Sequence, residues 1–230
     1  RNTKEKIEKT GEIQYDLFNS PGQLTNELKK EEYTDSQSKH FYQIIKNSLG
    51  SNLLFNKILK QKILSISLVK SELNKKSFGI SFSWSSYKSY YLEISQSSNS
   101  VGFIKTLFEK KDLTIIGYDL KQVFKFLNQF NIKIQCKCFD TKIAHYLINP
   151  DIGHDFNILS ETYLKFRTSF NKNSEIESPI ELSMEKSDLN FRLKEFLSKD
   201  LISGGLVDLF EKLEMPLLKV LALMESNGIK

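Results

Sequence analysis

Three segments in which apolar and polar residues alternate constrain the fold of this chain more than any other feature. They lie at residues 62–69, 77–84 and 89–94, and the third is rich in tyrosine. A period of two residues is typical of β-strands, because successive side chains point to opposite sides of a sheet. Short polar turns separate the segments, so the pattern predicts an antiparallel meander.

The rest of the chain mixes helical spacing with short apolar runs. A strand at 41–45 and a helix at 49–59 are predicted before the meander. After it, strands are predicted at 113–116 and 132–138, a polar gap at 171–178, and helices at 101–108, 120–127, 141–147, 156–166, 189–201 and 206–224. Pro216 lacks an N–H and should kink or restart the last helix. The order of elements indicates an α/β fold in which helices flank both faces of a mixed sheet.

Composition separates a polar beginning from a globular remainder. Residues 1–38 hold few apolar side chains and a turn signal at 20–22, so we expect a linker or tail that is poorly ordered. The whole chain is 40% apolar and 27% charged, which is typical of a globular protein. No apolar run approaches the roughly 18 residues of a membrane span, and the charged first residues do not form a signal peptide. We therefore expect a cytoplasmic protein without a membrane partner.

Positive charge is concentrated in the middle of the chain. Residues 41–139 carry 15 basic and 5 acidic side chains, whereas residues 140–230 carry 11 and 15. Such asymmetry can mark a surface that meets a polyphosphate. A genome rich in A and T also encodes many lysines at surface positions that tolerate substitution. The lysines of this block are spaced singly, which agrees with that explanation. Both explanations stay open.

Several motifs follow one another in the second half of the chain. Residues 117–121 read Gly-Tyr-Asp-Leu-Lys, residues 139–150 begin Phe-Asp-Thr and end Asn-Pro, and residues 154–164 begin with His and end Glu-Thr-Tyr-Leu. In this order they resemble the segments "G-x-N-L-K-Y-D", "F-D-T-x-x-A-x-Y-L-L-N-P" and "H-x-L-x-x-L-A-E-x-Y-L" of the 3′–5′ exonuclease-type domain of bacterial family A DNA polymerases. Residues 209–217 and 224–230 resemble the helix that opens the polymerase domain of that family.

The resemblance covers about residues 41–230 and implies a domain organisation. Residues 39–205 would form a 3′–5′ exonuclease-like domain with a ribonuclease H-like fold, and residues 206–230 the first helix of the polymerase domain. Residues 1–38 would precede them as the linker or tail.

Exonucleases of this fold cleave phosphodiesters with two divalent metal ions held by carboxylates. The resemblance places the first two carboxylates, "D-x-E", at Ser67 and Val69, the third at Val123, and the fourth, in "Y-x-x-x-D", at Lys186 with Leu182 at the Tyr position. None of these residues is acidic, and an ammonium group repels a metal ion at close range. We therefore expect no catalytic residue, metal or cofactor in this segment.

Other carboxylates offer alternatives. A second register of the last motif uses Phe196 and Asp200, which restores one carboxylate. Glu72, Asp119 and Asp188 lie near the three motifs, but we expect Glu72 in a solvent-facing turn, Asp119 as the N-cap of a helix and Asp188 on another side of its helix. Asp140 is expected to cap the helix that follows it.

The remaining candidate residues have structural explanations. His40, His145 and His154 have no ligand spacing, so we expect surface or capping roles. Two cysteines are too few for a disulfide scaffold. We expect Cys136 and Cys138 to be small buried groups on one face of a strand rather than a redox pair. Four aromatic residues could stack nucleic acid bases, although packing on a sheet is the simpler expectation; they are Trp84, Tyr87, Tyr90 and Tyr91.

The leading hypothesis is an inactive, vestigial proofreading domain that supports the polymerase domain of the same chain. The parent protein would carry out template-directed DNA synthesis in replication and repair, with Mg²⁺ in its polymerase domain. DNA would be a weak and non-specific partner of this segment, through the basic middle block. Two alternatives remain: an active metal-dependent 3′–5′ exonuclease with displaced carboxylates, and a stand-alone nucleic-acid-binding module.

Overall fold

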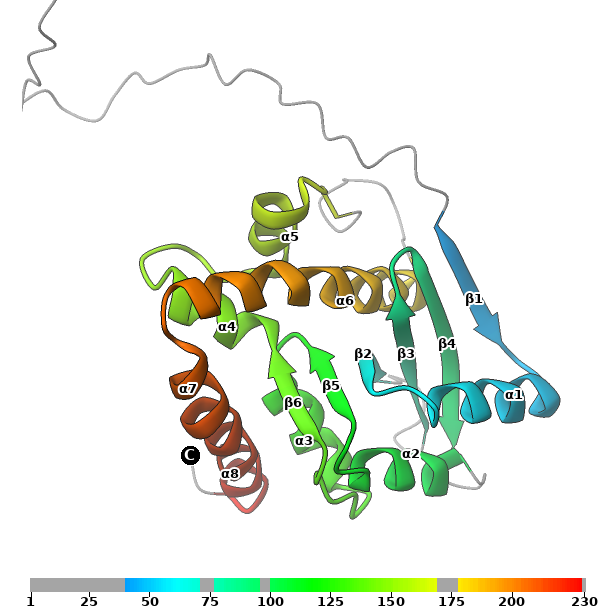
Figure 1. Ribbon diagram of the computed structural model, residues 1–230. Helices are drawn as coiled ribbons and strands as arrows, with labels where there is room; N and C mark the ends of the chain where they lie inside the picture. Colours follow the sequence, from blue (N-terminus) through cyan, green and yellow to red (C-terminus); the bar gives the residue numbers. More distant parts are fainter. Residues whose placement is uncertain (1–39, 71–76, 96–99, 169–177, 229–230) are drawn as a thin grey trace, which may run out of the picture. The chain divides into compact units, whose positions relative to one another are not determined.

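The computed structural model describes residues 40–70, 77–95, 100–168 and 178–228 (Figure 1). The predicted tail at 1–38 lies outside these residues. A six-stranded sheet in the order β1-β4-β3-β2-β5-β6 forms the centre. Its strands are β1 (Phe41–Ile45), β2 (Ile63–Lys70), β3 (Ser77–Ser85), β4 (Lys88–Ser95), β5 (Thr114–Gly117) and β6 (Lys137–Asp140).

Strand pairing confirms the predicted meander and the mixed sheet. β3 pairs antiparallel with both β2 and β4. β1 pairs parallel with β4, β5 with β2, and β6 with β5. Parallel neighbours need a crossover connection, and α1 (Ser48–Ile58) and α3 (Leu120–Asn128) lie in two of the connecting segments.

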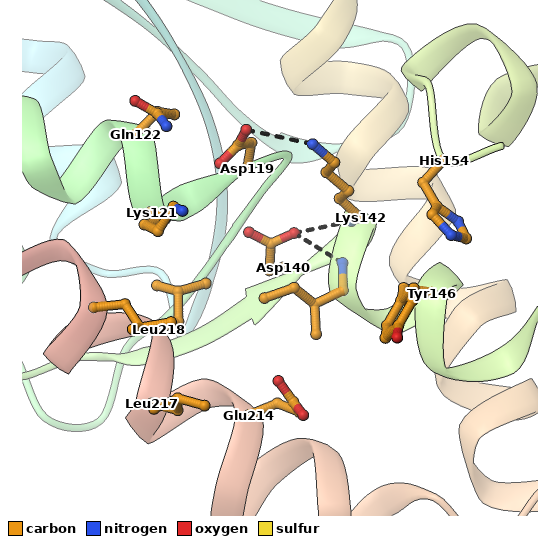
Figure 2. Close-up of a pocket in the computed structure, with 12 residues that line it drawn as sticks. Asp119, Lys121, Gln122, Asp140, Lys142, Tyr146, His154, Glu214, Leu217 and Leu218 are labelled. Atoms are coloured by element: carbon orange, nitrogen blue, oxygen red, sulfur yellow. Dashed lines mark hydrogen bonds and ion pairs between the residues drawn. The ribbon is translucent and has the colours of Figure 1, made fainter. Parts of the chain in front are cut away.

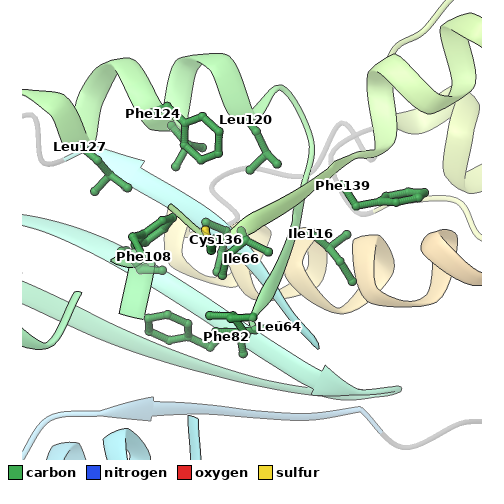
Figure 3. Packing of buried hydrophobic residues seen from close by; sticks show 14 of the residues in the cluster. Leu64, Ile66, Phe82, Phe108, Ile116, Leu120, Phe124, Leu127, Cys136 and Phe139 are labelled. Carbon is green, nitrogen blue, oxygen red and sulfur yellow. The ribbon is translucent and has the colours of Figure 1, made fainter. Parts of the chain in front are cut away.

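Helices cover both faces of the sheet, as predicted. One face packs its aliphatic and aromatic side chains against α2 (Ser100–Glu109) and α3, where Phe78 of β3 meets Phe126 with ring centroids 5.1 Å apart. Figure 3 shows part of this buried cluster around Leu64, Ile66 and Phe82. On the other face α6 (Pro179–Ser203) runs across the strands and contacts β2, β3, β4 and β5 (Figure 1). α4 (Thr141–Ile148) and α5 (Phe156–Leu164) pack against α6.

The prediction that a helix begins at residue 189 was wrong, because α6 begins ten residues earlier. Ser178 caps it by accepting a hydrogen bond from the Ile180 amide, and Pro179 occupies the first turn, where its missing N–H costs nothing. Before Leu189, α6 buries Ser183 and Ser187, with Met184 as the one large apolar residue among its buried positions. A helix that buries serines lacks the apolar stripe from which helices are recognised in a sequence.

The prediction of a strand at 132–138 was also wrong. β6 contains only Lys137–Asp140. The amides of Gln135 and Cys136 both donate to the carbonyl of Phe108, at 2.9 and 3.0 Å, so this part of the chain is held by α2 instead of by a neighbouring strand.

The last helix changes its geometry before Pro216, as the sequence predicted. α7 (Val207–Leu209) leads into a π-helical turn (Phe210–Glu214), and α8 (Met215–Ser226) follows. The Met215 amide donates to the Phe210 carbonyl, five residues back. Pro216 has no N–H to donate to the preceding turn, and the wider turn ends directly before α8, which begins at Met215. α8 packs against α3 and β6.

Candidate functional site

Small hydroxyl side chains line the face of the sheet that α6 covers. The Ser81 hydroxyl is hydrogen-bonded to that of Ser183 on α6, and the Ser89 hydroxyl lies 2.7 Å from that of Ser187. All four serines are buried. Small side chains let the helix approach the strands closely, and the paired hydroxyls avoid the cost of burying a polar group without a partner.

Ser67 and Val69 lie on this α6 face of β2. Ser67 is directly opposite Ser81 in the β2–β3 pair, and directly opposed residues point to the same side of a sheet. Val69 is two residues further along β2 and therefore shares that side. Both side chains are half-buried. The strand thus presents one hydroxyl and one isopropyl group at the two positions that the resemblance assigns to "D-x-E".

Lys186 lies on the helix that packs against this face. It follows Ser183 by three residues, so the two side chains occupy neighbouring positions on the surface of α6. The ammonium nitrogen of half-buried Lys186 lies 5.8 Å from the centroid of the Phe156 ring on α5. Burial lowers the pKa of Lys186, and the charge of Glu185 acts in the opposite direction. This position therefore holds a partly desolvated cation.

Val123 lies on the other side of the sheet. It belongs to α3, is 8% exposed, and is part of the apolar cluster. α3 packs against the face that carries Phe78, whereas Ser67 and Lys186 are on the α6 side. The structure therefore brings three of the four positions to one side and places the fourth in the core.

The donor atoms at these four positions do not suit a divalent cation. Mg²⁺ requires oxygen ligands, chiefly carboxylates. Ser67 offers one hydroxyl, the two valines offer no donor atom, and Lys186 offers a positive charge. Across the described residues, no three His, Cys, Asp or Glu side chains come together in a way that could hold a metal ion.

The second register of the last motif, which uses Phe196 and Asp200, places its carboxylate far from β2. Asp200 lies fourteen residues after Lys186, which is about 21 Å along an α-helix. Its carboxylate interacts with Tyr163 at the end of α5; burial and this neighbour raise the pKa of Tyr163 to about 12. Phe196, at the Tyr position of this register, is 42% exposed. Asp200 therefore lies at the far end of α6, away from Ser67.

Asp188 points to another side of α6, as predicted. Its buried carboxylate accepts hydrogen bonds from the Tyr87 amide at 2.6 Å and the Tyr42 hydroxyl at 3.1 Å, and His40 lies 3.6 Å away. Burial raises the pKa of Asp188, while these donors lower it. Asp188 thus ties the β3–β4 turn and β1 to α6. Glu72, the remaining acidic candidate, lies outside the described residues.

Asp140 caps two helices at once, and Figure 2 shows its bonds to the start of α4. It accepts hydrogen bonds from the Lys142 and Ile143 amides at the start of α4, as predicted, and from the Leu120 amide at the start of α3, at 2.6 Å. Burial raises the pKa of Asp140 to about 6, and the amide donors act against that rise. Asp119 occupies the N-cap position of α3, as predicted, but it has a left-handed backbone (φ 54°) and its side chain makes no cap hydrogen bond in the described structure. Asp140 supplies that bond instead.

A cavity of about 300 Å³ borders these helix starts (Figure 2). α3, α4 and α8 supply its walls, and Asp119 and Lys142 form an ion pair at its rim, with 3.5 Å between oxygen and nitrogen. Leu217 and Leu221 of α8 line it from the other side. The cavity lies between the exonuclease-like part of the chain and the helix expected to open the polymerase domain.

Sequence reasoning missed the pairing of two histidines. His145 is fully buried, and its Nδ1 lies 3.0 Å from that of His154, although we expected surface or capping roles for both. Burial and the neighbouring His154 lower the pKa of His145. Nine residues separate the two histidines, and only the return of the chain between α4 and α5 brings them together. His40, by contrast, lies near the surface beside Asp188.

The cysteines and the aromatic cluster largely follow the prediction. Cys136 is buried in the apolar cluster, although it precedes β6 rather than lying within it, and half-buried Cys138 lies in the strand. Trp84 and Tyr90 stack with ring centroids 4.8 Å apart. Tyr91 is buried on the sheet.

None of the helices in the described part of the chain combines the length and hydropathy that a membrane span requires.

The fold is shared with several solved structures. Brucella melitensis NrnC superposes with a TM-score of 0.64 at 17% identity, covering 82% of this chain and 93% of NrnC. The catalytic core of RRP6 from Trypanosoma brucei gives 0.64 at 11% identity, covering 78% and 52% of the two chains. The POL domain of Pol1 from M. smegmatis, solved with a DNA primer-template and dNTP, gives 0.64 at 14% identity and covers 81% and 32%. The architecture is therefore a ribonuclease H-like exonuclease fold.

Sequence comparison then identifies the family. The model of the 3′–5′ exonuclease domain of A-type DNA polymerases matches residues 42–180, so the chain belongs to that family. DNA polymerase I of Borreliella burgdorferi is 30% identical over 244 residues, covering 97% of this chain and 26% of the relative. DNA polymerase I of Treponema pallidum is 30% identical over 139 residues, covering 55% and 14%. The chain spans about a quarter or less of the length of these relatives.

Proposed function

We propose that this chain is a non-catalytic 3′–5′ exonuclease-like domain that supports the polymerase domain of a DNA polymerase I. The observation that carries the proposal is the set of side chains at the family's four carboxylate positions. Ser67, Val69, Val123 and Lys186 provide a hydroxyl, two aliphatic groups and an ammonium group. A two-metal phosphodiesterase needs carboxylates at these positions to hold its ions.

The placement of these residues supports the proposal. Lys186 lies on the helix that covers the strand with Ser67 and Val69, and a cation there disfavours a metal ion by direct repulsion. Val123 contributes to the apolar core on the other side of the sheet. Substitution of the carboxylates therefore leaves a well-packed domain without the ligands of the reaction.

The outward side of the last helical segment supports a role as a scaffold. Phe210, Met215 and Leu218 pack into the core, while the opposite side exposes several large apolar residues. They include Leu213, Val220 and Leu223; Leu217 and Leu221 are also exposed but line the cavity beside α3 and α4. Exposed apolar clusters of this kind mark interaction surfaces. We place the polymerase domain of the same protein on this side, with residues 206–230 as its first helix and residues 1–38 as a linker before the exonuclease-like domain.

The parent protein in this proposal synthesises DNA on a template during replication and repair in the cytoplasm. Its reaction takes place in the polymerase domain, where Mg²⁺ would be bound. The exonuclease-like domain contributes weak, non-specific attraction to DNA through the basic residues of the 41–139 block. A polymerase domain encoded directly after Lys230 is expected, whereas a stop codon there would favour a stand-alone nucleic-acid-binding module.

An exonuclease assay tests the proposal. The purified chain is incubated with single-stranded DNA labelled so that removal of the 3′ nucleotide is detected, in Mg²⁺ and separately in Mn²⁺. We expect no release above that of a heat-denatured sample of the same preparation. Metal-dependent release that disappears in Asp119→Ala or Asp200→Ala, but persists in the exposed control Asp208→Ala, would establish the rival: an active exonuclease with displaced carboxylates.

A further inference from the structure

Three aromatic side chains form a row across three neighbouring strands. Trp84 of β3 stacks on Tyr90 of β4, with ring centroids 4.8 Å apart and an angle of 10° between the rings. Phe41 of β1 meets Tyr90 edge to face, with centroids 6.1 Å apart. β3, β4 and β1 lie side by side at one end of the sheet (Figure 1). We call Trp84, Tyr90 and Phe41 the aromatic row.

The aromatic row lies on the face of the sheet opposite α6. Ser89 points toward α6, because its hydroxyl is bonded to Ser187, so the next residue, Tyr90, points away. A β-bulge between Phe82 and Ser85 adds one residue to β3 at this point, and Trp84 lies within it. Bulges re-aim the side chains that they carry. The row is therefore separate from Ser67 and Lys186, which lie on the α6 side.

The row is accessible to a ligand. Phe41 is 52% exposed, which is unusual for a phenylalanine on a strand, and Trp84 and Tyr90 are half-buried. An exposed ring at the end of an ordered stack offers a planar apolar surface. Unpaired nucleic acid bases stack on such surfaces with little dependence on sequence, because every base has a π-face.

The charge around the row complements a phosphate backbone. Residues 40–70 and 77–92, which include β1, α1, β2, β3 and most of β4, contain six lysines and no acidic residue. All six are exposed; they are Lys46, Lys57, Lys60, Lys62, Lys70 and Lys88. Lys88 lies directly opposite Phe41 in the β1–β4 pair. Ser65 lies opposite Ser83 in the β2–β3 pair, so the start of β2, which Lys62 directly precedes, lies beside Trp84. The acidic Glu195 lies on α6, where it lines a hollow with Ile63 and Ser86. Asp188 reaches this end of the sheet only from the α6 side, where it is buried.

We propose that the aromatic row, together with Lys88 and Lys62, binds single-stranded DNA by stacking unpaired bases while the lysines contact phosphates. Duplex DNA presents phosphates but keeps its bases stacked inside, so it would use the lysines alone. The site goes beyond the proposed function, and it does not depend on whether the four carboxylate positions of the family can catalyse a reaction.

Tryptophan fluorescence provides a direct test, because Trp84 is the single tryptophan of the chain. The full chain is titrated at low salt with oligothymidylate of about 12 nucleotides, within the range that single-strand sites cover. We expect saturable quenching of Trp84. Phe41→Ala should weaken binding about tenfold, as expected for the loss of one base–aromatic stack. Lys88→Gln should make the plot of log K against log salt concentration less steep by about one, as expected for the loss of one phosphate contact.

Two variants control for folding and for loss of apolar surface. Phe196→Ala removes a phenylalanine of similar exposure, 42%, from α6 on the other side of the sheet, and should bind like the parent chain. Phe41→Leu keeps an apolar group without a ring, so it should resemble Phe41→Ala in affinity and the parent chain in thermal melting. Equal effects of Phe41→Ala and Phe196→Ala would overturn the proposal. So would binding of duplex and single strand with equal affinity, or no quenching at saturation. None of these results bears on the exonuclease assay.

Discussion

The two faces of the central sheet are built on opposite principles. The face toward α2 and α3 carries large apolar side chains such as Phe78, Ile80 and Phe82, all buried. The face toward α6 carries serines, and its contacts with the helix include the Ser81–Ser183 and Ser89–Ser187 hydroxyl pairs. The first face removes a large apolar area from water, which is the dominant favourable term in folding. The second face determines how closely α6 packs against the sheet and at which position along the strands.

On the function proposed above, this difference explains how the fold can persist without the family's carboxylates. Ser67 and Val69 lie half-buried on the α6 face, beside the serines of β3 and β4. Substitutions there change the chemistry of the surface without removing the apolar cluster that holds the strands together. We expect the apolar face to dominate stability and the α6 face to tolerate change.

The largest expected effect comes from the apolar face. Phe78→Ala should lower the free energy of unfolding by about 3–5 kcal/mol, because it deletes a fully packed ring and leaves a cavity. Ser81→Ala, three residues further along β3 and on the α6 face, should cost about 1 kcal/mol. Urea denaturation measures both. Equal losses would show that the two faces contribute alike and would break the comparison.

Asp140 connects the two sides, since it caps α3 on one and α4 on the other. Its pKa of about 6 is above that of an unfolded aspartate, so the folded chain holds this proton more tightly. The stabilisation from the protonated form is present below about pH 4 and is lost as the pH rises through 6.

Asp140→Asn removes this titration. As the pH rises from 4 to 7, the parent chain should therefore lose up to about 3 kcal/mol of unfolding free energy relative to the variant. Urea denaturation at intervals across that range measures the difference. A difference independent of pH would mean that folded Asp140 has the pKa of an unfolded aspartate, because the amide donors then cancel the effect of burial.

The hydroxyl pairs of the α6 face can be tested as pairs. In a double-mutant cycle of Ser81→Ala and Ser183→Ala, the second substitution should cost less than the first, because an isolated buried hydroxyl has already lost its partner. We expect a coupling energy of about 0.5–1 kcal/mol. Ser89→Ala combined with Ser183→Ala provides the control, since these residues belong to different pairs and should be additive.

The smallest expected effect concerns the attachment of α8 to α3. Glu225 accepts from Lys121 at 2.9 Å and from Lys125 at 3.2 Å on the protein surface. Glu225→Gln should lower the melting temperature by only about 1 °C at low salt and not at all at high salt, because exposed ion pairs are weak and screened. A large shift that persists in high salt would show that this pair, rather than the apolar contacts of Leu218 and Met215, holds the helix.

Much of the local structure could be predicted, and the failures have a common cause. Alternation identified β2, β3 and β4 because each strand exposes its two faces to different environments. The first half of α6 was missed because it buries serines, and the strand predicted at 132–138 failed because Cys136 is held by α2. In both cases contacts with distant parts of the chain outweighed the local pattern.

The sequence by itself determined the meander and the break before Pro216, because each depends on the chemistry or spacing of neighbouring residues. The four carboxylate positions remain what the resemblance of the sequence assigns. Only the tertiary structure decided that Asp140 caps two helices, that His145 meets His154, and that Trp84, Tyr90 and Phe41 form one row. Each of these depends on strand order, register or the return of the chain, which bring together residues that are far apart in the sequence.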